Sequence, residues 1–357
     1  MIKKIQIILF SIVVSPILLY GQDVTERRAN FDTAFLVIKK LVEEDQPKTF
    51  KKAVFITEYA FMGRQIDYKK FDDYIYHLTF LCQKFADVNP LTGYNYPDSL
   101  NLQNNYAVFK LMKDTIRTLT RGKIDVINYP YTYNFDDFFG HQDWTNMFVS
   151  KLLVTHKGNC HSLPYLYKIL CDEQEATCWL AMAPNHLYIK NRCKKSGWYN
   201  TELTSGDFPI DAWISSSGYI PIEAIRSGIY MDTLSNRQAI ALCAIDLAKG
   251  YERLIKDYDD GFMIKCCDLA LQYHPQNAQA LLLKAEVLKR IYTKRLQLNN
   301  KPDDELFGQM KAVYSKLVDL GYREMPEEMY VNWLNSVSKE RSKYTNHKLL
   351  SDLKGTN

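Results

Sequence analysis

Apolar residues recur with a helical period over much of the chain. Stretches 32–42, 71–82 and 106–116 place apolar side chains three and four residues apart, the spacing that gives a helix one buried face. The segment 89–97 contains two prolines and a glycine and separates the second stretch from the third. The pattern therefore predicts a helical N-terminal region over residues 22–125.

The pattern changes in the middle of the chain, where one helix is followed by short strands. Residues 163–171 keep the helical spacing, and Pro164 is tolerated only near the start of a helix. Segments 176–183, 186–190 and 198–204 are separated by turns and alternate their side chains between two faces. This order predicts a buried helix beside an antiparallel sheet.

The segments on either side of this helix and these strands show little hydrophobic periodicity. Residues 129–144 are dense in aromatic and acidic side chains, and we expect an irregular segment that walls a cleft. Residues 207–221 are expected to form a loop and a strand.

The helical period returns towards the C-terminus. Leu-Ala-x-x-Tyr within 241–254 and Cys-x-x-Ala-Leu within 262–273 precede Pro275, after which an alanine-rich helix begins. This arrangement resembles the boundary between tetratricopeptide repeats, where a proline ends one helix pair and small residues let the next pack closely. With only one and a half repeats visible, residues 233–357 are expected to be either a plain helical appendage or a short peptide-binding groove.

The N-terminus has the pattern of an export signal. A basic Met-Ile-Lys-Lys precedes the apolar run 5–20, and Gly21 is small enough for cleavage before Gln22. An uncleaved anchor is the alternative, but the run is short for a membrane span and contains Pro16. We expect residues 1–21 to be a signal peptide, no stable membrane span after cleavage, and a periplasmic or secreted bacterial protein.

Composition narrows the possible functions. The net charge of +4 is too small to indicate nucleic-acid binding, and no run of Lys or Arg forms a patch. Eight cysteines permit disulfides in an exported chain, and Cys171 and Cys178 are close enough in sequence to pair. Without a Cys-x-x-Cys pair or a histidine cluster, we expect neither a zinc site nor a cofactor.

Cys160 is the first candidate for chemistry. It follows Gly158 and Asn159, which read as a turn and a helix cap, so its sulfur is expected at the positive end of a helix that favours a thiolate. A buried structural cysteine is the alternative. The strands that follow supply His186 and Glu202, in the order that a Cys-His-acid triad requires: the histidine deprotonates the thiol and the acid fixes the histidine tautomer.

Three short motifs resemble one known family. Gly-Asn-Cys-His-Ser at 158–162, Pro-Asn-His-Leu-Tyr-Ile at 184–189 and Gly-Trp-Tyr-Asn-Thr-Glu-Leu-Thr at 197–204 are similar to the transglutaminase-like superfamily. Within it, the Pro-x-His segment resembles the branch named for the SirB1 protein. The resemblance covers residues 140–205 and implies a papain-like fold.

The resemblance also implies roles for individual residues. Cys160 would be the nucleophile, His186 the base and Glu202 the acid. Glu202 stands where the family usually has aspartate, and Leu203 stands where it usually has proline. Asn200 competes with Glu202 for the contact with histidine, because it shares the strand face and papain-like enzymes use asparagine there.

Two classes of function follow from this resemblance. The first is an exported cysteine-dependent amide or ester hydrolase, protease-like or amidase-like, that forms a thioester with a peptide, protein or cell-wall amide. Hydrolysis is expected more than crosslinking, because the bacterial members look mostly hydrolytic. The second is an inactive scaffold that binds a protein or peptide partner through its helical repeats, since many members of the branch have lost the cysteine.

A cysteine amidase needs a second donor to the oxyanion besides the main-chain N–H of Cys160. The side chains of Gln142, Trp144 and Asn146 can each donate such a hydrogen bond, and aromatic packing against the core is the alternative role for each.

We therefore expect an α+β protein. Its core, residues 126–232, is expected to be papain-like or transglutaminase-like, with the Cys-bearing helix packed on an antiparallel sheet. Helical regions at 22–125 and 233–357 flank the core, and the length of 357 residues suffices for several folded units.

Overall fold

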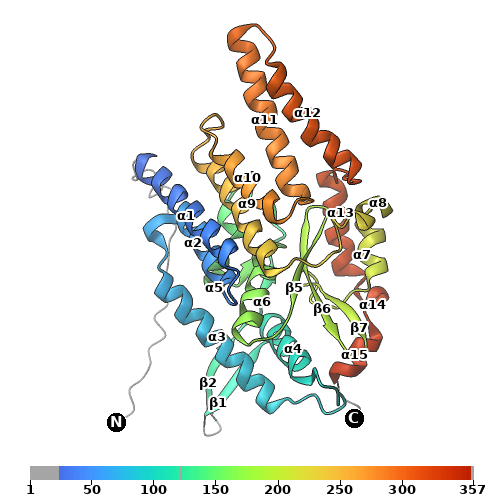
Figure 1. Cartoon of the computed structure of the whole chain (residues 1–357). Coiled ribbons are helices and arrows are strands. Elements are labelled where there is room, and N and C mark those ends of the chain that lie inside the picture. Colours follow the sequence, from blue (N-terminus) through green and yellow to red (C-terminus); the bar gives the residue numbers. More distant parts are fainter. Residues whose placement is uncertain (1–23, 121–122, 355–357) are drawn as a thin grey trace.

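The computed structural model describes residues 24–120 and 123–354 (Figure 1). Over these residues the fold is α+β, mostly helical, with one three-stranded sheet and two two-stranded sheets. The expected signal peptide, residues 1–21, lies outside the described residues. None of the helices described is both long and apolar enough to cross a bilayer.

Long helices form the first part of the described chain, and the 3-10 turn η2 extends the second of them. The helical prediction for this region is confirmed as far as Lys113. It is wrong for residues 116–120 and 123–125, because these belong to two strands that pair antiparallel. Ile116, Thr118 and Thr120 are β-branched at alternate positions, which favours a strand over a helix. The elements are α1 (Val24–Glu44), α2 (Phe50–Met62), η2 (Gly63–Gln65), α3 (Tyr68–Val88), α4 (Ser99–Lys113), β1 (Ile116–Thr120) and β2 (Lys123–Asn128).

The central sheet contains the three predicted strands, but the first begins three residues later than predicted and the third ends at Thr201, before Glu202. It consists of β5 (Trp179–Ala183), β6 (His186–Cys193) and β7 (Gly197–Thr201), antiparallel in the order β5-β6-β7. Asn185 turns the chain between the first two strands with a φ of 55°, a left-handed conformation that asparagine tolerates. The helix α6 (Ser162–Glu173) packs on β5 and β6, as the sequence pattern predicts.

Short elements surround this sheet. The irregular segment expected before residue 144 is present, and η3 and α5 follow it. The prediction of a loop and a strand over residues 207–221 is wrong, because part of it forms α7, anchored by buried Trp213 and Ile214. A segment of this length has too few turns to reveal its helical period. The short elements are β3 (Thr132–Tyr133), η3 (Trp144–Met147), α5 (Val149–Thr155), β4 (Lys157–Gly158), α7 (Asp211–Ser217) and α8 (Ile222–Arg226).

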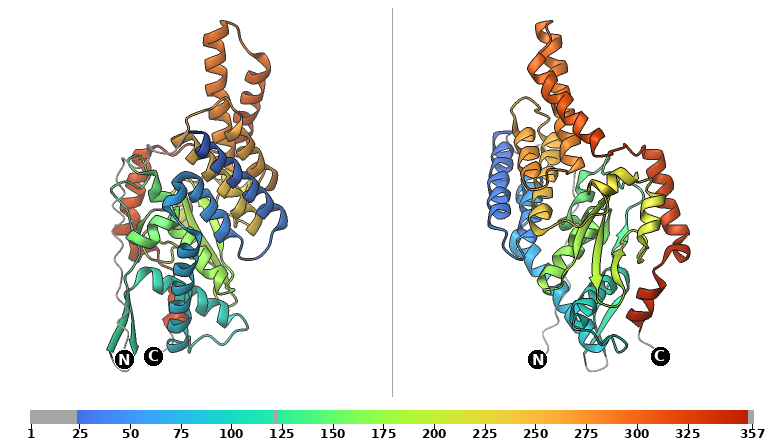
Figure 2. Two further views of the ribbon diagram at one scale, coloured as in Figure 1. Left: turned by 90° about the vertical axis from the view of Figure 1, so that its left-hand side faces the viewer. Right: turned by 45° about the vertical axis from the view of Figure 1, so that its right-hand side comes forward.

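The helices predicted after residue 236 form successive hairpins, and the first begins with a capping box between Ser235 and Gln238. Both α1 and α2 pack on α9, so the N-terminal and C-terminal helices form one continuous layer (Figure 2). Phe31 meets Tyr251 edge to face across this contact at a centroid distance of 5.2 Å. The hairpins are formed by α9 (Asn236–Leu254), α10 (Phe262–Tyr273), α11 (Ala278–Asn299) and α12 (Asp304–Asp319).

The last helices leave that layer and return to the core. They are α13 (Glu327–Lys339), α14 (Arg341–Tyr344) and α15 (His347–Lys354), and they lie on the other side of the sheet from α6 (Figures 1 and 2). The main chain of Asn346 donates to the carbonyl of Phe208 at 2.8 Å. Residues 327–354 are therefore part of the core in space, although their sequence periodicity groups them with the preceding helices.

Candidate active site

Cys160 lies in the turn that leads into α6. The side-chain oxygen of Asn159 accepts hydrogen bonds from the main-chain N–H groups of His161 (3.0 Å) and Ser162 (3.2 Å), so it closes the turn before the helix. The N-cap position predicted for Asn159 is taken by His161. A Cβ at Gly158 would lie 2.4 Å from the hydroxyl of Ser162, so this close turn requires glycine. The thiol is thereby fixed at the positive end of the helix.

His186 is held by hydrogen bonds at both ring nitrogens. Its Nε2 is 2.7 Å from Oε2 of Glu202, and its Nδ1 is 3.3 Å from the hydroxyl of Tyr330. The other carboxylate oxygen of Glu202 accepts from the main-chain N–H of Thr204 at 2.8 Å. The predicted contact between Glu202 and the far nitrogen of His186 is confirmed, and the ring orientation is fixed by it.

Asn200 does not take the place of Glu202. Its amide donates to the carbonyl of Pro209 at 2.9 Å and to the carboxylate of Asp211 at 2.8 Å. The side chain therefore ties β7 to the start of α7, and Glu202 is the group that contacts His186.

Tyr330 connects the sulfur to the histidine. Its hydroxyl donates to Sγ of Cys160 at 3.2 Å and lies within hydrogen-bonding reach of His186. The side chain is fully buried and stacks on Phe139 and Trp333, at centroid distances of 5.2 and 5.5 Å. Tyr330 is on α13, far from the three motifs in sequence, and no local pattern marked it as a site residue.

The charges of the site favour a thiolate paired with an imidazolium. Burial alone would raise the pKa of Cys160, but the hydrogen bond and charge of His186, with Tyr330, lower this pKa below its ordinary value. Burial opposes the charge on His186, yet Glu202 and Cys160 raise the pKa of the ring to about 10. The pKa of Glu202 is lowered by the same histidine despite its burial.

A second, half-buried histidine lies beside the thiol. His161 Nε2 is 3.0 Å from the carboxylate of Asp246, and Nδ1 is 2.9 Å from the carbonyl of Met147. The carbonyl at Nδ1 and the carboxylate beside Nε2 both favour the protonated, positively charged form of the ring. Burial opposes this charge, but Asp246 raises the pKa of His161, and the charged ring helps to lower the pKa of Cys160.

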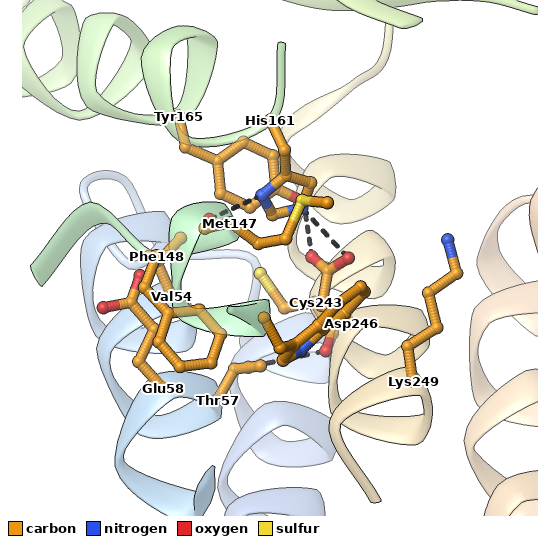
Figure 3. A pocket seen from close by; sticks show the side chains of 11 residues that line it. Val54, Thr57, Glu58, Met147, Phe148, His161, Tyr165, Cys243, Asp246 and Lys249 are labelled. Carbon is orange, nitrogen blue, oxygen red and sulfur yellow. Dashed lines mark hydrogen bonds and ion pairs between the residues drawn. The ribbon is translucent and has the colours of Figure 1, made fainter. Parts of the chain in front are cut away.

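Figure 3 shows how this second pair is built. His161 and Tyr165 reach from one side towards Asp246 of α9, and the hydroxyl of Tyr165 donates to that carboxylate at 2.7 Å. Thr57 and Glu58 of α2 lie on the far side of a small cavity of about 70 Å³. The helical layer therefore contributes a charged group to the surroundings of the site, which the sequence motifs did not indicate.

A cleft of about 450 Å³ gives access to the thiol. Cys160 and His186 line its floor, and Phe138 and Phe139 line one wall, as predicted for the irregular segment. Helices α9 and α11 supply the opposite wall. The cleft therefore lies between the core and the helical layer.

The candidate oxyanion donors differ in their surroundings. The amide of Asn146 donates to Asp137 at 2.9 Å, and Gln142 is exposed outside the cleft lining. Trp144 lines the cleft, but its indole nitrogen is itself buried and has no hydrogen-bond partner within the described part of the chain, so a ligand in the cleft does not reach this N–H. The main-chain N–H of Cys160 likewise has no acceptor there. Of the groups considered, this main-chain N–H is the donor available to an oxyanion.

All eight cysteines are described, and all are free thiols. Cys171 and Cys178, which the sequence allowed to pair, are not joined by a disulfide. Among residues 24–120 and 123–354, no group of three or more His, Cys, Asp or Glu side chains is arranged to hold a metal ion.

We expect the substitution Tyr330→Phe to raise the pKa of Cys160 by about one unit, because a hydrogen bond to a charged sulfur is worth about 1.5 kcal/mol. The ring and its stacking remain, so the effect isolates the hydroxyl. The measurement is the pH dependence of Cys160 alkylation, followed by mass spectrometry of the labelled peptide. Tyr344→Phe is the control, because that hydroxyl bonds to Glu340; an unchanged profile in Tyr330→Phe would exclude a role for this donor.

Comparisons of the chain with protein-family models, with curated proteins and with solved structures found no match. The resemblance to the transglutaminase-like superfamily therefore stays a prediction that rests on the three motifs.

Proposed function

We propose that this protein is an exported cysteine-dependent amide or ester hydrolase with a papain-like or transglutaminase-like core. The observation that supports this most directly is the hydrogen-bonded series from Glu202 through His186 to Tyr330 and the sulfur of Cys160. In this series Cys160 has a hydrogen-bond donor that stabilises a thiolate, and His186 has a carboxylate partner that stabilises an imidazolium. A cleft that opens on the sulfur gives room for a peptide, protein or cell-wall amide.

The proposed reaction has two halves. The thiolate of Cys160 attacks the substrate carbonyl carbon, and the resulting oxyanion accepts a hydrogen bond from the Cys160 N–H. The tetrahedral intermediate collapses to a thioester as His186 gives its proton to the departing amine or alcohol. His186 then takes a proton from water, whose oxygen attacks the thioester, releases the carboxylic acid product and restores the thiolate.

Acyl transfer from an activated ester tests this proposal without knowledge of the natural substrate. We expect p-nitrophenyl acetate to release p-nitrophenol with turnover and to leave an acetyl group on Cys160, detected by mass spectrometry after an acid quench. Cys160→Ala should abolish both signals, and Cys82→Ala is the control, because Cys82 is buried in the N-terminal helices. Acetylation that is absent, or unchanged in Cys160→Ala, would contradict the enzyme.

An inactive scaffold is the second candidate. The observation that favours it is the cover over the site: Trp333 packs edge to face on His186 at a centroid distance of 4.5 Å, and Tyr330 contacts the sulfur. In that case the cleft between the core and the helical layer would bind a protein or peptide without acylation. The acetylation experiment separates the two candidates.

A further inference from the structure

The wall of the cleft opposite the aromatic residues carries several charges. Most of them are balanced by near neighbours: Glu252 pairs with Arg290 at 3.3 Å, and Glu286 lies 3.6 Å from Lys289. The charge on His161 is balanced by Asp246, as described above. These groups add little net charge to the cleft.

Two cations on α9 are not balanced in this way. Lys249 donates from Nζ to the neutral side chain of Gln279 at 3.3 Å, and Figure 3 shows it extending past Asp246 without turning towards that carboxylate. The guanidinium of Arg253 lies over the ring of Trp144, 4.9 Å from its centroid. Within residues 24–120 and 123–354, neither cation forms an ion pair with a carboxylate.

Both cations line the same cleft as the thiol of Cys160. Lys249 and Arg253 are four residues apart on α9, so they lie on one helix face, and both line the cleft that contains Cys160. The contact with Trp144 holds the guanidinium of Arg253 in the lining, and a guanidinium can bind a carboxylate through two N–H groups. The rest of the lining includes the apolar side chains of Leu282 and Leu283. The cleft therefore suits an apolar chain that carries one negative charge.

We propose that the substrate acylating Cys160 carries a carboxylate, which Lys249 and Arg253 bind while the thiolate attacks a nearby amide or ester carbonyl. This inference rests on the proposed function and specifies its substrate class. The carboxylate belongs either to the C-terminus of a peptide or to an acidic side chain, since both present the same charge and geometry.

Thiol-reactive probes that differ in one carboxylate test the inference on the full mature chain. Three maleimides are used: one linked to Gly-Ala amide, one to Gly-Ala with a free carboxylate, and one to Gly-Glu amide. The thiolate adds to the maleimide double bond, forming a carbon–sulfur bond, and the neighbouring carbon takes a proton from water with no leaving group. The second-order rate of Cys160 labelling is measured by mass spectrometry and divided by the rate for glutathione.

We expect at least one carboxylate probe to label Cys160 about tenfold faster than the neutral probe, because oriented cations raise the local concentration of an anion. The faster probe identifies a terminal or a side-chain carboxylate as the group recognised. The double substitution Lys249→Met and Arg253→Gln should remove the advantage, while Lys311→Met, an exposed lysine on α12, should keep it. The advantage should also shrink with added salt.

Equal rates for the three probes, or an advantage that persists in the double variant, would overturn the inference. Failure of the proposed function gives a different result: the neutral probe would then label Cys160 no faster than glutathione, and His186→Ala would change nothing. The ratio of the labelling rates of the charged and neutral probes can be measured in either case. Failure of the carboxylate inference is therefore distinguishable from failure of the proposed function.

Discussion

The substitution His186→Ala is expected to slow the alkylation of Cys160 by iodoacetamide at about pH 6 by at least about tenfold. The histidine and its charge lower the pKa of Cys160, so the thiolate persists in acid. Without the ring, burial of the sulfur and an ordinary thiol pKa of about 8.5 leave about 0.3% thiolate at that pH. The rate is measured by mass spectrometry of the peptide that contains Cys160.

Two comparisons make this result specific. Glu202→Gln should keep part of the reactivity, because the acid orients the histidine and does not itself accept the proton. The buried thiols of Cys82 and Cys243, whose pKa values are raised by burial, should stay slow in every variant. Slow labelling of Cys160 in the folded protein, unaffected by His186→Ala, would favour the scaffold.

The pH profile of alkylation carries further information. The pKa of Cys160 is lowered, so its thiolate forms as the pH rises through that lowered value, and the pKa of His186 is raised to about 10. Between these two limits the pair stays in its charged form. The unsubstituted chain should therefore show a plateau of reactivity over the neutral range, whereas His186→Ala should show a simple thiol titration.

The central residues of the site were accessible from the sequence because each belongs to a local pattern. Cys160 follows a capping asparagine before a helical stripe. His186 begins β6, and Glu202 directly follows the adjacent strand β7. Strand alternation then decides which side chains share a face. The contact between His186 and Glu202 could be predicted from these features alone.

The rest of the site depends on contacts between distant segments. Tyr330 is 170 residues from Cys160 along the chain, and its contact depends on how α13 returns to the core. Asp246 meets His161 only because α9 packs beside α6. Helical periodicity shows that these segments are helices with a buried face, but it does not specify the partner of that face.

The errors in secondary structure have a related cause. The hairpin of β1 and β2 follows α4 after only two residues. The apolar spacing of the end of α4 therefore makes the first residues of β1 look like a continuation of the helix. The short helix α7 is stabilised by buried Trp213, which stacks near Trp333 of α13 at a centroid distance of 6.2 Å. Tertiary packing thus decides the conformation of a segment whose local preference is weak.

The substitution Asp246→Asn is expected to lower the free energy of unfolding by about 3–5 kcal/mol, the range found when one partner of a buried ion pair is removed. His161 and Asp246 are both largely enclosed, with side-chain exposures of 17% and 14%. Without the carboxylate, the ring between Met147 and α9 must either stay charged without a counter-ion or lose a proton. The hydroxyl of Tyr165 also loses its charged acceptor. Urea unfolding followed by circular dichroism measures the change.

The control is Asp32→Asn, which removes an exposed ion pair between Asp32 and Lys265 at 2.7 Å on the same helical layer. Such surface pairs contribute at most about 1 kcal/mol. A loss in Asp246→Asn no larger than that of the control would contradict the assignment of a buried, charged pair.

The pH dependence of this difference follows from the two pKa directions. The folded-state pKa of Asp246 is lowered by His161 against the effect of burial, so its contribution is present above the unfolded pKa of about 3.9 and is lost as the pH falls through the folded value. The folded-state pKa of His161 is raised by Asp246, again against burial, so its contribution is present below the unfolded pKa of about 6.5 and is lost as the pH rises through the folded value. The difference in stability between the unsubstituted chain and Asp246→Asn should therefore be largest between about pH 4 and 6.5 and should decrease on either side. A difference that stays the same below about pH 4 and above about pH 6.5 as between them would mean that the hydrogen bond of Tyr165, and not the ion pair, accounts for the effect.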